Sequence, residues 1–75
     1  LTVILHKDRS KPIVSIGVMY HVGSKDEDPN RTGFAHFFEH LMFEGSENIK
    51  RGEFDSLVLN AGGEANAYTT FDYTY

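Results

Sequence analysis

The spacing of apolar residues predicts strands at the start of the chain. Residues 1–5 are almost all aliphatic or β-branched, and residues 13–22 alternate apolar side chains with Ser15, Gly17 and His21. Alternation with a period of two is typical of strands that bury one face. Residues 7–12 are polar and end in proline, which suits a hairpin connection. We therefore expect an antiparallel pair, followed by a charged loop over residues 23–31.

Residues 33–45 have the spacing of an amphipathic helix instead. Apolar side chains gather on one side of this helix: Phe34, Phe38 and Leu41, with Phe37 and Met42 at the margins. Thr32 is a suitable N-cap and Gly45 a suitable residue after the C-cap, so the expected ends agree with the periodicity. We expect this apolar stripe to be buried.

The opposite side of the same helix carries His36, Glu39 and His40. Residues three and four apart are neighbours on a helix, so the two imidazoles can reach one metal ion, and histidine nitrogen is a common zinc ligand. Zinc lowers the pKa of a bound water from about 16 to about 7, which lets a nearby carboxylate act as general base. The order His-x-x-Glu-His is the inverzincin motif, and it supplies two of the three protein ligands of a catalytic zinc site.

A second helix is predicted at about residues 51–61, with apolar side chains on one face: Phe54, Leu57, Val58 and Ala61. Gly62 and Gly63 end it. From Glu64 onward, alternating alanine, threonine and aromatic residues predict one or two further strands. The order β-β-α-α-β predicts an α+β fold, with antiparallel strands packed with helices.

Composition limits how this chain can be stabilised. It has 75 residues, 40% of them hydrophobic, and no cysteine, so neither disulfides nor thiolate zinc ligands are available. A chain of this size buries only about 60% of its unfolded surface. Neither end carries a capping or turn signal, and we therefore expect residues 1–75 to be a piece of a larger protein.

Charge and hydropathy exclude two classes of partner. The net charge is −4 and the seven Lys and Arg residues are scattered, so nucleic-acid binding is not expected. No apolar run approaches the length of about 20 residues that spans a bilayer.

Three stretches together resemble the pitrilysin family of inverzincin metallopeptidases, which includes the insulin-degrading enzyme and the mitochondrial processing peptidase. They are residues 33–46, the Asn-Ala-Gly-Gly of residues 60–63, and residues 66–75. The resemblance implies that His36 and His40 bind Zn²⁺ and that Glu39 is the catalytic base. It also implies a third ligand, a glutamate beyond Tyr75, because the glutamates at positions 44, 47, 53 and 64 come too early to match it.

The resemblance further implies substrate contacts. Asn66 and Ala67 match the strand beside the active site, whose edge pairs with an extended substrate, and the Asn66 amide would orient the bound peptide. Phe43 lies one turn beyond Glu39, and two roles remain open for it: packing within the domain, or lining the substrate cleft.

These expectations describe a zinc-dependent metalloendopeptidase that hydrolyses peptides or unfolded polypeptide segments. The resemblance implies that residues 1–75 are the N-terminal part of one larger pitrilysin-like peptidase domain. It also implies a second homologous half, either in the same chain or as a partner subunit in a homodimer or heterodimer. The alternative is a non-catalytic structural or chaperone-like subunit of the same family. We expect the isolated 75-residue chain to be inactive. A bacterial periplasm or cell envelope and an organelle are both compatible with these residues.

Overall fold

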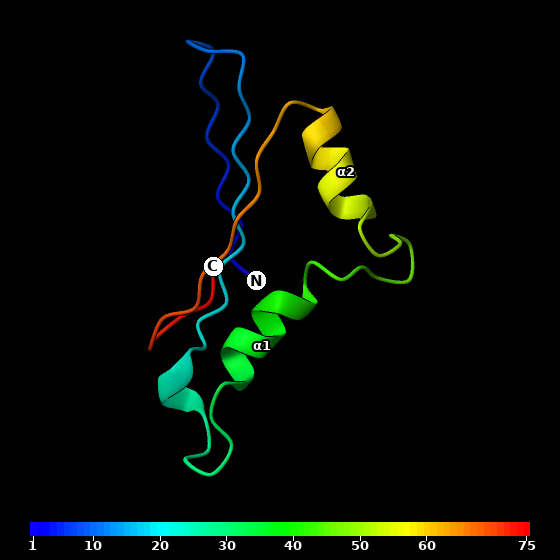
Figure 1. Cartoon of the computed structure of the whole chain (residues 1–75). Helices are drawn as coiled ribbons and strands as arrows, with labels where there is room; N and C mark the ends of the chain where they lie inside the picture. Colours follow the sequence, from blue (N-terminus) through cyan, green and yellow to red (C-terminus); the bar gives the residue numbers. More distant parts are fainter.

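The computed structural model describes residues 1–75, and its regular structure is helical. A 3₁₀ turn, η1 (Ser24–Asp26), precedes two α-helices, α1 (Phe34–Leu41) and α2 (Glu53–Asn60). Figure 1 shows the two α-helices joined end to end by a loop and a short coiled ribbon for η1 before α1, while the remaining chain is drawn as a tube. The molecule measures 47 × 28 × 19 Å. Neither helix has the length and apolar character that crossing a membrane requires.

The predicted α+β fold with antiparallel strands is wrong, because the chain contains no strand and no sheet. A strand needs a ladder of consecutive backbone hydrogen bonds, and residues 1–19 make none with other backbone groups. The chain does reverse direction after the first extended segment (Figure 1). Pairing is limited to isolated bridges, in which Tyr20 and Thr69 each pair with Thr74 and Ser46 pairs with Ile49.

The apolar side chains do not form a core. No hydrophobic residue is buried, and the buried residues are Gly23, Glu39 and Thr74. The stripe on α1, which was expected to be buried, is open: Phe34 is 47% exposed and Phe38 is 54% exposed. A stable domain needs a second layer to cover such a face, and two short helices do not supply one. Polar contacts therefore carry much of the organisation around α1.

Helix α1 begins one residue later than predicted and is capped from a distance. Gly33, with φ of 91°, is the N-cap in place of Thr32 and offers no side chain. Instead, the Glu27 carboxylate accepts hydrogen bonds from the backbone N–H groups of Gly33 and Ala35. A carboxylate is favoured there because the helix N-terminus presents unpaired N–H groups and a partial positive charge. The loop before α1 thus fixes where the helix starts.

Helix α2 ends as the glycine pair predicted. Gly62 has φ of 76°, a left-handed conformation that costs glycine little. Its N–H donates to the Leu59 carbonyl and the Gly63 N–H donates to the Val58 carbonyl, both at 2.9 Å, which is the Schellman pattern. Before α2, an ion pair spans the loop that connects the two helices: Arg51 Nε lies 2.5 Å from Glu44 Oε2.

The C-terminal segment folds back as a tight hairpin. Tyr68 and Tyr75 exchange two backbone hydrogen bonds of 2.9 Å, and the Thr70 N–H donates to the Tyr73 carbonyl at 2.8 Å. Thr74 also exchanges backbone hydrogen bonds with Tyr20, at 2.8 and 2.9 Å. This pairing is too short to count as strands. It nevertheless holds residues 68–75 beside the segment that leads into α1.

Candidate metal and catalytic site

The two histidines of α1 face each other on adjacent turns. Their Nε2 atoms lie 3.0 Å apart and their ring centroids 4.7 Å apart, and both residues are exposed. Without a metal, one Nε2–H can donate to the other ring. Two Zn–N bonds of about 2.0–2.1 Å at a tetrahedral angle separate the nitrogens by about 3.3–3.4 Å. The pair therefore fits one zinc ion after a small adjustment of the rings.

The remaining parts of a zinc site are not within this chain. No group of three or more His, Cys, Asp or Glu side chains is placed to hold a metal ion. The Nδ1 atoms of His36 and His40 make no hydrogen bond with the protein, although metal-binding histidines usually donate this second N–H to a carboxylate or carbonyl. The chain by itself thus offers two of the three protein ligands that catalytic zinc uses.

Glu39 is the buried ionisable group of the chain, at 9% exposure. The Thr69 hydroxyl donates a hydrogen bond to its Oε2 at 2.6 Å, a length typical of an O–H group bound to an ionised carboxylate. Glu39 Oε1 accepts no hydrogen bond from the protein. The carboxylate is therefore held at one oxygen and open at the other.

A polar hollow of about 450 Å³ brings together parts of the predicted site. Its lining combines one face of α1, the segment before this helix and the start of the C-terminal hairpin: Ser24, Glu27, Thr32, Gly33, His36, Glu39, Ala67, Tyr68, Thr69 and Thr70. His36, Glu39 and Ala67, all predicted as site residues, share this hollow. His40, Phe43 and Asn66 are outside its lining.

Asn66 and Phe43 make local contacts instead. The Asn66 side-chain carbonyl accepts a hydrogen bond from the Ala67 N–H at 2.9 Å, so this group is already used within the chain. Phe43 is half-buried and packs edge-to-face on Phe54 of α2, with ring centroids 5.8 Å apart. In this chain Phe43 therefore links the two helices.

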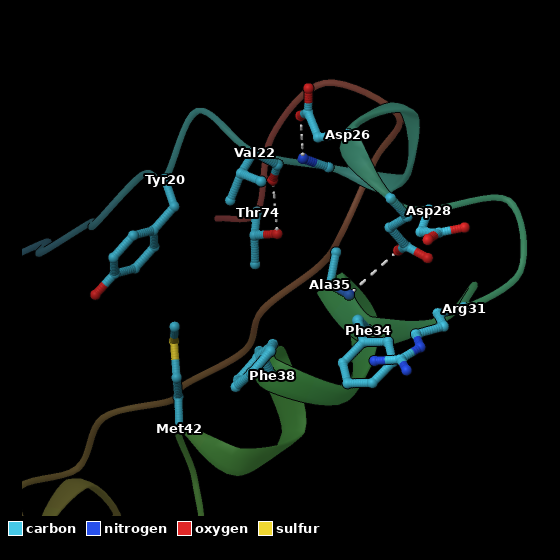
Figure 2. Close-up of a pocket in the computed structure, with 12 residues that line it drawn as sticks. Tyr20, Val22, Asp26, Asp28, Arg31, Phe34, Ala35, Phe38, Met42 and Thr74 are labelled. Carbon is cyan, nitrogen blue, oxygen red and sulfur yellow. Dashed lines mark hydrogen bonds between the residues drawn. The ribbon is translucent and has the colours of Figure 1, made fainter.

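The apolar side of α1 borders a second hollow, an open groove of about 510 Å³. Figure 2 shows Phe34, Phe38 and Met42 along one wall, with Tyr20 and Thr74 across from them. The helix thus separates two surfaces of different character. The histidines and the apolar stripe are on different sides, as the periodicity predicted.

The residues that position Glu39 were missed by sequence reasoning. Thr69 lies 30 positions away from Glu39, and Glu27 lies six and eight positions before the N–H groups that it caps. No periodicity connects such positions, because the folding back of the chain creates these contacts. Thr69 falls within the stretch that resembles the family, which was the available signal.

An ion pair fastens η1 to the hairpin near this hollow. The hydrogen bond from the Lys25 ammonium lowers the pKa of the Asp72 carboxyl, and the same contact raises the pKa of Lys25. His21 Nε2 also lies 3.5 Å from the Asp72 carboxylate. The backbone N–H groups of Ser24 and Lys25 reinforce this attachment by donating to the carbonyls of Thr70 and Phe71, each at 3.0 Å.

Comparison of the sequence with known proteins shows which family the chain resembles. The family described as Insulinase (Peptidase family M16) matches residues 2–75. The zinc protease PqqE of Helicobacter pylori is 45% identical over 62 residues, which are 83% of this chain and 14% of that protein. Human cytochrome b-c1 complex subunit 1, mitochondrial, is 32% identical over 71 residues, covering 95% of this chain and 15% of that protein.

A solved structure agrees with the sequence relationship. The crystal structure of a protease from Helicobacter pylori matches with a TM-score of 0.72 and 48% identity, over 75% of this chain and 14% of that one. The chain therefore spans about one seventh of the length of these relatives. Since the family match extends over almost every residue, the chain belongs to the insulinase family of peptidases, family M16.

Proposed function

We propose that the protein carrying this chain is a zinc-dependent metalloendopeptidase that hydrolyses peptides or unfolded polypeptide segments. One observation carries the proposal: Glu39, buried and held at one oxygen, shares a hollow with His36, whose Nε2 lies 3.0 Å from that of His40. Relatives named as zinc proteases support it.

The two imidazole nitrogens would hold the metal, with a further ligand from outside these 75 residues. When bound there, zinc supplies a Lewis acid that acidifies water and polarises a carbonyl oxygen. His36 and His40 serve this purpose as neutral ligands, since a protonated imidazole cannot coordinate. Their exposed position on α1 leaves room for a third ligand and for substrate.

Glu39 performs the proton transfers. Its free Oε1 takes a proton from the attacking water as the water oxygen bonds to the scissile carbonyl carbon. The same carboxyl then gives the proton to the leaving nitrogen as the carbon–nitrogen bond breaks. One water is consumed, one carboxyl and one amino end are formed, and Glu39 returns to its ionised state.

The backbone next to Glu39 offers an edge for an extended substrate. Tyr68 and Thr70 direct their hydrogen bonds inward to Tyr75 and Tyr73, whereas the N–H and carbonyl of Thr69 have no backbone partner. An incoming peptide can add to this edge as a further strand, gaining main-chain hydrogen bonds that do not depend on its side chains. This mode suits unfolded segments of varied sequence.

The test uses the full-length protein, a polypeptide of the relatives' length that contains this chain. Because general base catalysis contributes about 10²- to 10⁴-fold, Glu39→Gln is expected to lower peptide hydrolysis by at least that range while zinc stays bound. Wild-type activity should disappear on chelation and return with zinc. Glu47→Gln, at an exposed position, is the control. Normal hydrolysis by Glu39→Gln would refute the base assignment.

A second function is favoured by one relative. Human cytochrome b-c1 complex subunit 1 is named as a subunit of a complex and not as a protease, and it covers 95% of this chain. The alternative is therefore a non-catalytic structural subunit. Zinc-loaded full-length protein that hydrolyses no unfolded peptide would favour this alternative, whereas the retention of His36, Glu39 and His40 favours the enzyme.

A further inference from the structure

We infer that Thr69 is a positioning residue for the general base: it holds Oε2 of Glu39 and leaves Oε1 as the oxygen that exchanges protons. This inference rests on the proposed function, because it assigns a task to Thr69 within that reaction. It concerns the hydrogen bond that joins Glu39 of α1 to Thr69 of the C-terminal hairpin.

The direction of this hydrogen bond follows from counting hydrogens. An ionised carboxylate only accepts, so the hydroxyl of Thr69 must be the donor in its 2.6 Å contact with Glu39. The Thr74 hydroxyl donates to the Val22 carbonyl at 3.1 Å. Each hydroxyl carries a single hydrogen, so neither is left to donate across the 3.4 Å that separates Thr69 from Thr74. The hydrogen of Thr69 is therefore committed to Glu39.

Thr69 is itself held firmly. The residues on either side of it are paired by backbone hydrogen bonds of 2.8–2.9 Å to Tyr75 and Tyr73. Its β-branched side chain has few rotamers, and the residue is half-buried. The anchor comes from the C-terminal hairpin, 30 residues along the chain from Glu39. It can thus fix the rotation of the Glu39 carboxylate independently of the helix.

The two oxygens of Glu39 consequently differ in what they can do. Oε2 has a short, charge-assisted hydrogen bond, whereas Oε1 has no protein partner, and Glu39 itself lines the hollow. Removal of the Thr69 hydroxyl leaves a buried oxygen without its donor, and the carboxylate then turns to find another partner. Turning moves Oε1 away from the attacking water. The loss is expected in the chemical step and not in substrate binding.

The experiment compares Thr69→Val, which keeps the shape, with Thr69→Ser, which keeps the hydroxyl, in the full-length zinc-loaded protein. We expect Thr69→Val to lower kcat about ten- to hundredfold with little change in KM or zinc content, as removal of one hydrogen bond to a charged group predicts. Thr69→Ser should restore kcat to within about threefold of wild type. Thr2→Val, at an exposed position in the N-terminal segment, is the matched control.

The outcomes separate this inference from the proposed function. Wild-type kcat in Thr69→Val, beside an inactive Glu39→Gln, overturns the positioning role alone. Equal losses in the Val and Ser variants, or a loss that is entirely in KM, also overturn it. If Thr69→Val also lowers the melting temperature, the kcat of Thr69→Ser decides: a value within about threefold of wild type supports the positioning role, and a value as low as that of the Val variant overturns it. Hydrolysis by Glu39→Gln at the wild-type rate overturns the proposed function itself.

Discussion

His36 and His40 would bind the same ion, but their surroundings differ. His36 lines the polar hollow with Glu39, whereas His40 stands outside it, one turn further along α1. The His40 side chain is exposed and makes no polar contact with the protein except the one to His36. Its role in the metal site can therefore be tested with little effect on the fold.

We expect His40→Ala in the full-length protein to lose both bound zinc and peptide hydrolysis, since two protein ligands cannot replace the usual three. Alanine favours helix, so α1 should persist. Metal analysis and circular dichroism check both points. His6→Ala is the control, because His6 lies in the exposed N-terminal segment. Full zinc stoichiometry in His40→Ala would remove this residue from the ligand set.

At the residue scale, the sequence predicts only what local spacing determines. The side-by-side placement of His36 and His40 follows from four-residue spacing on a helix. The burial of Glu39 and its bond to Thr69 do not, because both depend on a hairpin that returns from 30 residues away. Asn66 shows the same limit, since its amide makes a local hydrogen bond to Ala67 that spacing does not reveal.

At the scale of elements, the two helices were predictable and the strands were not. Helix ends follow local rules, and Gly62 stops α2 where the glycine pair indicated. Strands depend on hydrogen-bonded partners, and residues 1–5 and 13–19 make no backbone hydrogen bonds. An alternating pattern therefore indicates which side chains share a face. It does not determine whether a neighbouring segment forms the backbone hydrogen bonds that make an extended segment a strand.

The C-terminal end of α2 gives a test at this scale. Gly62→Ala should lower the free energy of unfolding by about 1 kcal/mol, because a side chain disfavours the left-handed conformation while nothing lies within 4 Å to clash with it. Gly62→Asn should recover part of the loss, since asparagine tolerates this conformation. Denaturant unfolding of the full-length protein measures both. Equal stability of all three proteins would contradict the assigned cap.

The attachment of η1 to the hairpin should depend on pH. The pKa of Asp72 is lowered by Lys25, so the stabilisation is present above the ordinary carboxyl value of 3.8 and is lost as pH falls through the lowered pKa. The raised pKa of Lys25 means that its share is lost only at pH above 10.5. His21, also beside Asp72, contributes a smaller part of the lowering of the Asp72 pKa.

Asp72→Asn should therefore destabilise the full-length protein at about pH 7 and have a smaller effect at about pH 3, where protonation of this carboxyl in the unfolded chain, with its ordinary pKa of 3.8, already removes part of the stabilisation. Unfolding measurements at both values, with Glu64→Gln as an exposed control, check this. The effect should shrink in high salt because both side chains are about half exposed. A difference that is the same at both pH values would argue against the ion pair.

At the scale of the whole molecule, these residues resemble one side of an interface. The apolar face of α1 and the extended N-terminal segment are open, with Val14 at 86% and Ile16 at 87% exposure. The chain spans about one seventh of its relatives' length. The sequence was therefore informative about which faces are apolar, but it did not reveal what covers them, because the covering layer of a domain is formed by other elements.

The contact between Glu39 and Thr69 also closes a loop of 30 residues, and all of α2 lies inside it. The entropy of closing a loop grows only with the logarithm of its length. Ten residues inserted beside α2 would lengthen the loop by a third and cost only about 0.3 kcal/mol. Evolution can therefore remodel the segment between Glu39 and Thr69, in length and in sequence, while the distance between the two side chains stays the same.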